Sequence, residues 1–139
     1  MLTIGFVLPE GFQIMGLAAA SAFELANATA REPLYDIRLL SEQGGPVRNS
    51  LAMTIQTRPM ARNKPDTLIV CGLLRPQPTS PGLVRLIRRA AASSRRVAAV
   101  CTGAFILGVA GLLDGRRVTT HWFHARNFQQ QFPGVHLEV

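Results

Sequence analysis

The sequence is poor in the residues that build disulfide scaffolds and metal centres. Its 139 residues include only two cysteines, Cys71 and Cys101, and three histidines. Two cysteines are too few for a disulfide framework, and no grouping of cysteine and histidine has the spacing of a zinc site. We therefore expect two reduced thiols, no metal site and no cofactor.

Long apolar runs are also missing. The run from Ala104 to Leu113 is cut off by Asp114 and two arginines, so it falls short of the roughly 18 to 20 residues that a transmembrane helix needs. The opening residues, MLTIGFVLPEGF, have no basic region and no small-residue cleavage site, which argues against a signal peptide. We expect a cytoplasmic protein without a membrane partner.

Acidic residues are scarce, with 8 against 15 basic residues and a net charge of +7. Such an excess can indicate an acidic partner such as nucleic acid. The basic residues are scattered along the chain, apart from one cluster: Arg85, Arg88, Arg89, Arg95 and Arg96. We interpret this cluster as a solvated helix face, with direct binding of duplex DNA as the alternative.

The chain is rich in short apolar strands that alternate with helical patterns. Strands are predicted over residues 2–8, 34–40, 67–70, 97–100 and 135–139, with a further short strand that ends at His121. Helices are predicted over residues 15–30, from Pro81 onward with Ser80 as N-cap, and over 104–113 and 122–132. Residues 51–57 are expected to be extended and residues 58–65 to form a loop. Trp122, Phe123 and Phe128 are the expected anchors of the last helix.

This order of elements predicts a single α/β domain. Parallel neighbouring strands need helical crossovers, so alternation of strand and helix favours a doubly wound, three-layer sandwich around a mostly parallel sheet. Ligands of such sheets gather at the carboxyl ends of the strands. Four segments end there: residues 10–16, 71–74, 101–102 and His121.

Cys101 occupies the most informative position in the chain. It follows a strand and precedes a helix, where backbone N–H groups and the helix dipole favour a thiolate. The N–H of Thr102, with one from Gly72 or Leu73, could form an oxyanion pocket, and His121 could act as base or as hydrogen-bond donor. A small cysteine that fills a tight corner explains the position equally well. For Cys71, His124 and His136 we expect structural roles only.

The stretch CTGAFILGVAGLLDGRRVTTHW carries a resemblance. Together with the "PEGF" turn and the helix ending "AFELAN", it resembles the PfpI-like, class I glutamine amidotransferase-like domain at the N-terminus of GlxA-type AraC-family transcriptional regulators. The resemblance covers the whole chain. It implies a flavodoxin-like fold, a homodimer and a small effector, which we expect to be a nitrogen-containing metabolite.

The resemblance also assigns positions. Cys101 matches the elbow cysteine, His121 matches the histidine after it, and Gly72-Leu73 matches a glycine pair of which one is kept. Gly16 falls where enzymatic members carry an acidic residue that hydrogen-bonds the cysteine. Without that acid we expect no turnover, and a ligand site made of Gly16, Gly72, Leu73, Cys101, Thr102 and His121. If the domain is catalytic instead, Cys101 and His121 would carry the reaction of an isocyanide hydratase, a glyoxalase-like lyase or an amidase.

The resemblance extends to residue 139 and then stops. Members of the family continue with further strands and a final helix, and the regulators continue to two helix-turn-helix motifs. We therefore expect residues 1–139 to be a C-terminally incomplete PfpI-like domain of a longer regulator, which contacts DNA only through the missing part.

Overall fold

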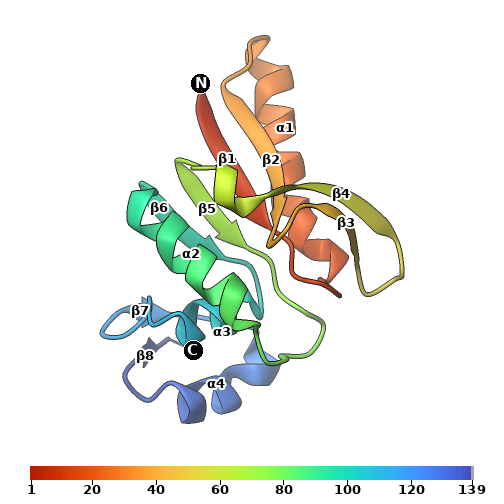
Figure 1. Cartoon of the computed structure of the whole chain (residues 1–139). Coiled ribbons are helices and arrows are strands. Elements are labelled where there is room, and N and C mark those ends of the chain that lie inside the picture. Colours follow the sequence, from red (N-terminus) through yellow and green to blue (C-terminus); the bar gives the residue numbers. More distant parts are fainter. Residues whose placement is uncertain (139) are drawn as a thin grey trace.

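The computed structural model describes residues 1–138, whose centre is a six-stranded sheet (Figure 1). The strands, in the spatial order β3-β4-β2-β1-β5-β6, are β1 (Leu2–Val7), β2 (Tyr35–Ser41), β3 (Gly45–Arg48), β4 (Thr54–Pro59), β5 (Thr67–Val70) and β6 (Arg96–Ala99). All neighbouring pairs are parallel except β3 and β4.

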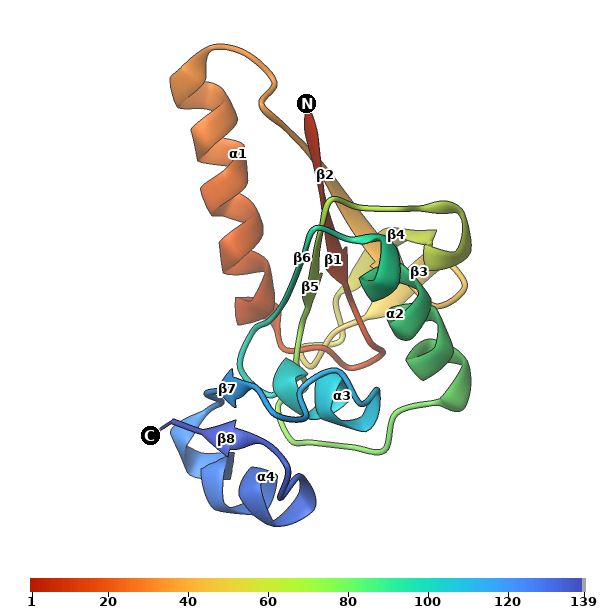
Figure 2. The same ribbon diagram turned by 90° about the vertical axis from the view of Figure 1, so that its left-hand side faces the viewer.

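Helices cover both faces of the sheet. They are α1 (Ala18–Ala30), α2 (Pro81–Ser93), α3 (Gly103–Val109) and α4 (Ala125–Gln131), with 3₁₀ turns at Ile14–Leu17, Met60–Arg62 and Trp122–His124. Figure 2 shows α1 on one side of the sheet and α2 on the other, with α3 and α4 at the carboxyl ends of the strands. The predicted doubly wound, three-layer α/β sandwich is confirmed. No helix among residues 1–138 has the length and apolarity required to cross a bilayer.

Strand β1 shows why the sequence requires two covered faces. Its continuous apolar run turns Ile4 and Phe6 toward α1, where Phe6 meets the ring of Phe23 at 6.2 Å, and turns Val7 toward the opposite core. Ile4, Phe6 and Val7 are all almost fully buried. If β1 carried polar residues on one face, the helix that covers that face would have no apolar surface to pack against.

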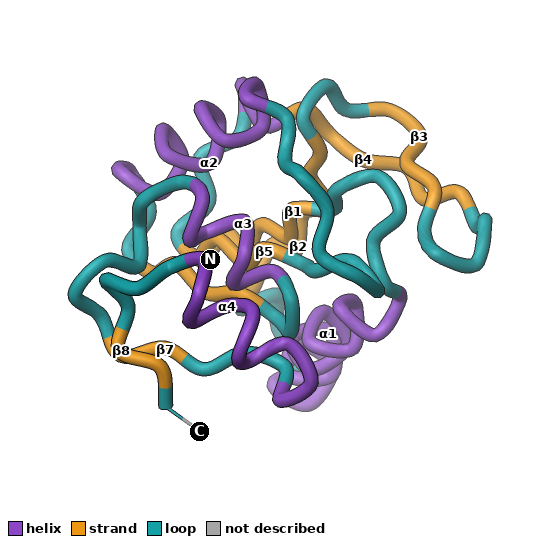
Figure 3. The backbone as a smooth tube through the Cα atoms, turned by 90° about the horizontal axis from the view of Figure 1, so that it is seen from below, coloured by secondary structure: helices purple, strands orange, loops and turns teal. Residues whose placement is uncertain are grey.

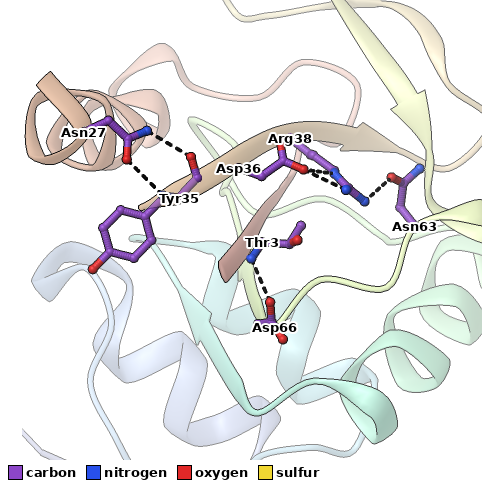
Figure 4. Close-up of polar contacts among 7 residues, drawn as sticks. All are labelled: Thr3, Asn27, Tyr35, Asp36, Arg38, Asn63 and Asp66. Atoms are coloured by element: carbon purple, nitrogen blue, oxygen red, sulfur yellow. Dashed lines mark hydrogen bonds and ion pairs between the residues drawn. The ribbon is translucent and has the colours of Figure 1, made fainter. Parts of the chain in front are cut away.

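Polar contacts fix the end of the sheet opposite α3. The amide of Asn27 on α1 makes two 2.9 Å hydrogen bonds with the backbone of Tyr35, which ties α1 to the start of β2 (Figure 4). The N–H of Thr3 donates to Asp66 at 2.7 Å, and so joins β1 to the residue before β5. These contacts tie α1 to β2 and β1 to β5 at this end, while the loops of the site lie at the opposite, carboxyl end of the sheet.

Helix α2 begins and packs as its sequence predicts. The Ser80 hydroxyl accepts a hydrogen bond from Leu83 N at 3.1 Å, with Pro81 at the first helical position. Its buried side is an apolar stripe: Leu83, Val84, Ile87 and Ala90. Arg85, Arg88 and Arg89 are exposed on the other side, and Arg88 Nε donates to Ala110 O at 2.8 Å.

Residues 45–65 differ from the prediction. Gly45–Arg48 form a strand that the sequence did not indicate, and it pairs antiparallel with β4. The extended piece expected at 51–57 is displaced to Thr54–Pro59, and Met60–Arg62 form a 3₁₀ turn inside the predicted loop. Pro46 argues against a strand at the sequence level, because proline has no N–H to donate to a neighbouring strand. β3 lies at the edge of the sheet, where a proline is tolerated.

The segment after α3 also differs. The helix predicted to reach residue 113 ends at Val109, and Gly111 turns the chain in a left-handed conformation at φ +74°. Seven helical residues rise only about 10 Å, too little to carry the chain back along the sheet. The short strand β7 (Arg117–Val118) therefore pairs with β8 (His136–Leu137) in a separate two-stranded sheet. The expectation that His121 ends a neighbouring strand of the main sheet is wrong.

The helical segments near the site are shorter than predicted. α1 begins at Ala18, and the segment before it, Ile14–Leu17, is a 3₁₀ turn. The predicted helix at 122–132 is a 3₁₀ turn followed by α4, in which Phe128 is fully buried. The other two expected anchors, Trp122 and Phe123, are 78% and 70% exposed. Of the strand predicted at 135–139, residues 136–137 form β8, while Val139 lies outside the described residues.

Candidate functional site

The site is built around a sharp turn between β6 and α3. Val100 N donates to Val70 O at 2.9 Å, which holds the end of β6 against β5, and the next residue, Cys101, adopts φ +53°. Gly103 N donates back to Val100 O at 2.9 Å and begins α3. A left-handed conformation is costly for a residue with a side chain. It turns Cys101 away from the core and leaves it exposed.

Close backbone packing explains the residues around the turn. A Cβ at Gly103 would collide with the carbonyl oxygen of Val70, and one at Gly72 would collide with Thr102 Oγ1 and lie 2.6 Å from Gly103 N. The buried Thr102 hydroxyl donates to Leu73 O at 2.6 Å. One short hydrogen bond, from the Thr102 hydroxyl to Leu73 O, thus joins the loop after β5 to the start of α3. The two backbones also approach closely at Gly72 and Gly103, where a Cβ would not fit.

Gly16 lies next to Cys71 on the other side of the site. Gly16 is buried in the 3₁₀ turn before α1, and a Cβ there would lie 3.0 Å from both Cβ and Sγ of Cys71. The Cys71 thiol donates to Gly16 O at 3.7 Å. Burial raises the pKa of Cys71 to about 12, so this thiol remains protonated and unreactive. The expected structural role of Cys71 agrees with this position.

His121 reaches the site from the loop between β7 and the last 3₁₀ turn. Its Nδ1 accepts a hydrogen bond from Phe123 N at 3.2 Å, and its ring stacks on Trp122 with centroids 5.6 Å apart. The neighbouring Thr120 hydroxyl donates to Cys101 O at 3.1 Å, which ties this loop to the turn. Within residues 1–138, no hydrogen bond joins His121 to the Cys101 thiol.

These loops enclose a pocket of about 550 Å³ at the carboxyl end of the sheet, the end seen in Figure 3. Its walls come from the 3₁₀ turn before α1, the loop after β5, the Cys101 turn and the segment after β7: Gln13, Met15, Gly16, Gly72, Leu73, Leu74, Arg75, Val100, Cys101, Thr102, His121, Phe123 and His124. All six residues of the predicted ligand site are among them. That they bind a ligand stays a prediction.

Three further lining residues, Gln13, Met15 and Leu74, belong to segments 10–16 and 71–74, which were expected at this end of the sheet but not assigned to the ligand site. Arg75 follows the Cys71–Leu74 segment directly, so the convergence of loops at this end of the sheet could have indicated it. His124 gave no comparable signal: it was expected to be structural, and it lies half-buried at the pocket. Among residues 1–138, no aspartate or glutamate lines the pocket. In the described part of the chain, no three acidic, histidine or cysteine side chains are grouped so as to hold a metal ion.

Comparison with known proteins identifies the family. The model of the DJ-1/PfpI family matches residues 19–133. The chain belongs to the DJ-1/PfpI family. An uncharacterized protein in the cpoL 5′ region of Streptomyces lividans is 39% identical to this DJ-1/PfpI chain over 129 residues, which are 89% of this chain and 90% of the relative.

Other relatives of this DJ-1/PfpI domain include transcriptional regulators. The HTH-type transcriptional regulator GlxA of Rhizobium meliloti is 35% identical over 136 residues, 94% of this chain but 42% of the regulator. The chain thus spans about two-fifths of the regulator's length. The isonitrile hydratase of Pseudomonas putida is 30% identical over 125 residues, 87% of this chain and 53% of the hydratase.

A solved structure shares the fold of this DJ-1/PfpI domain. The crystal structure of an AraC family transcriptional regulator from Pseudomonas putida superposes with a TM-score of 0.84 at 25% identity. The superposition covers 99% of this chain and 76% of that one.

Proposed function

We propose that this chain is the ligand-sensing and dimerisation domain of an AraC-family transcriptional regulator, without catalytic turnover of its own. It binds a small metabolite in the pocket at Cys101, and a part of the regulator outside residues 1–139 binds DNA. The regulator GlxA, with 35% identity over nearly the whole chain, supports this role.

One observation carries the proposal: the pocket has a cysteine turn but no carboxylate. The position that the resemblance gives to an acid is Gly16, and the space beside it is filled by the Cβ and Sγ of Cys71. Glu10, the nearest acidic residue in the sequence, is not part of the pocket lining. Without a carboxylate beside it, the Cys101 thiol lacks the acidic partner that the resemblance gives to the enzymatic members. His121 does not replace that group, since the hydrogen bond from Phe123 N to its Nδ1 places the proton of the neutral ring on Nε2 and leaves no ring nitrogen free to accept the thiol proton.

The alternative is a cysteine-dependent enzyme, such as an isocyanide hydratase, a glyoxalase-like lyase or an amidase. The exposed Cys101 side chain at φ +53° and the likeness to an isonitrile hydratase favour it. An enzyme would convert the compound that the pocket holds, whereas a sensor would release it unchanged.

The test is to incubate the chain with a bacterial metabolite extract and to identify retained compounds by native mass spectrometry. We expect a compound that is held without a covalent bond and recovered unchanged. Leu74→Trp should abolish retention by filling the pocket, while Leu25→Trp, at an equally exposed leucine of α1, should not. Conversion by the wild type but not by Cys101→Ser would establish the enzyme instead, and retention of nothing would contradict a sensor.

A further inference from the structure

The polar groups that line the pocket are charged side chains, hydrogen-bond acceptors and hydrogen-bond donors, and their charge is unbalanced. The titratable side chains of its lining are Arg75, Cys101, His121 and His124, and within residues 1–138 the lining includes no carboxylate. Within residues 1–138, Arg75 takes part in no ion pair, and its side chain is exposed. The one permanent charge at the pocket is therefore a positive guanidinium without a partner.

Three carbonyl oxygens at the pocket already accept a hydrogen bond from the chain itself. Gly72 O accepts from Gln13 N at 2.9 Å, and Leu73 O accepts from the Thr102 hydroxyl at 2.6 Å. Cys101 O accepts from the Thr120 hydroxyl at 3.1 Å. Each of these oxygens has one lone pair engaged, so it is a weaker acceptor for the N–H or O–H groups of a ligand than an unpaired carbonyl oxygen would be.

The side-chain donors, in contrast, are available. Because His121 Nδ1 accepts a hydrogen bond from Phe123 N, the proton of the neutral imidazole lies on Nε2, and the ring is a donor in either protonation state. Gln13 Oε1 accepts from Met15 N at 2.8 Å, which fixes the amide so that its NH₂ group remains to donate. Arg75 adds a planar fork of N–H groups that matches a carboxylate.

The rest of the wall is apolar and is formed by Met15, Leu73, Leu74, Val100 and Phe123. A volume of about 550 Å³ is in the range of small-molecule sites. A single fixed positive charge beside an apolar wall suits a monoanion with a hydrocarbon part better than a multiply charged phosphate.

We infer that the pocket selects a small carboxylate with an apolar body, whose oxygens are bound by Arg75, His121 and Gln13. This inference rests on the proposed function, since it names the ligand class of the same pocket. It also gives Arg75 a specificity-determining role, which its place in a loop after β5 did not reveal.

The experiment compares three probes of the same length and different charge: pentanoate, pentanamide and pentylamine. Dissociation constants are measured by NMR titration of the chain, with inorganic phosphate as a fourth probe. We expect pentanoate to bind about tenfold more tightly than pentanamide, because a charge-assisted hydrogen bond is roughly twice as strong as a neutral one. Pentylamine and phosphate should not bind in the pocket.

Two variants assign the effect to one residue. Arg75→Gln should weaken pentanoate binding about tenfold and leave pentanamide binding unchanged, and Arg85→Gln on α2, outside the pocket, should change neither. Equal or tighter binding of pentanamide, pentylamine or phosphate would overturn the inference but leave the sensor standing, and so would binding of no probe at all. Release of ammonia from pentanamide that depends on Cys101 would instead contradict the absence of turnover.

Discussion

The two cysteines of the chain sit at the ends of adjacent strands and differ completely in environment. Cys101 is exposed at the turn before α3, whereas Cys71 is fully buried against Gly16. Both residues follow short apolar strands, so the sequence predicts the same sheet end for the two thiols but not the difference in burial. The difference arises because the 3₁₀ turn before α1 covers Cys71.

Burial of Cys71 makes the stability of the fold depend on pH in the alkaline range. The pKa of this thiol rises from 9.0 to about 12 on folding, so between these values the folded chain keeps a proton that the unfolded chain has lost. The contribution of the Cys71 thiol to the free energy of unfolding is therefore fully present below pH 9. It is lost as the pH rises toward 12, by at most about 1.4 kcal/mol per pH unit.

Urea unfolding followed by circular dichroism at pH 8 to 11 measures this dependence. Cys101→Ser serves as the reference background, so that thiol oxidation does not interfere. Adding Cys71→Ala should flatten the dependence of the unfolding free energy on pH above 9. An equally steep decline in both proteins would mean that another group causes it.

At the scale of elements, the start of α3 depends on its bond to the loop after β5. The Thr102 hydroxyl is buried and donates to Leu73 O at 2.6 Å, so Thr102→Val removes the donor with little change in shape. We expect the free energy of unfolding to fall by about 1 to 2 kcal/mol, as for other lost hydrogen bonds that leave a partner unsatisfied. The matched control is Thr119→Val at an exposed threonine, which should lie within about 0.5 kcal/mol of wild type. Equal values for the two variants would show that this bond does not stabilise the turn.

Elements with a strong local pattern were predictable from the sequence. Strand β5 was placed at its exact residues, because Thr67–Val70 is a β-branched run between a proline and a glycine, and α2 was placed by the Ser80 cap. Strand β3 was missed because its four residues pair only through the antiparallel hairpin with β4. The wrong place for β7 reflects a long-range fact: its partner is β8, across α4, and no local pattern encodes that pairing.

The site was predictable in outline because strand ends converge. The sequence predicts that four residues lie at the carboxyl edge of the sheet: Gly16, Gly72, Cys101 and His121. All four line the pocket. His121 arrives there by a different route, through the loop after β7. Arg75 directly follows the segment 71–74, so its place near the pocket could have been inferred, but a loop residue has no periodicity that shows which way its side chain points.

At the scale of the whole molecule, strand β6 has an outer edge to which no other strand among residues 1–138 is paired. Strand β6 is last in the order, and Arg96, Val97 and Ala98 are exposed. Arg96 N and Val100 N both donate toward β5 or the residue before it, at 3.1 and 2.9 Å. Since alternate residues of a strand point their backbone groups to opposite sides, the N–H and C=O of Val97 face outward, where they are unpaired.

The expected homodimer can be tested at this edge. Two copies related by a two-fold axis could pair their β6 strands antiparallel and exchange the outward N–H and C=O groups. Val97→Pro removes an outward N–H without disturbing the bonds to β5, and an edge strand tolerates proline. In sedimentation equilibrium we expect wild type and the control Val97→Thr, which keeps the N–H, to have twice the 15.1 kDa chain mass, and Val97→Pro to be monomeric. A dimer that survives Val97→Pro would move the interface away from β6, and a wild-type monomer at about 100 µM would exclude self-association of this domain, because an interface that weak cannot hold a regulator together at cellular concentrations.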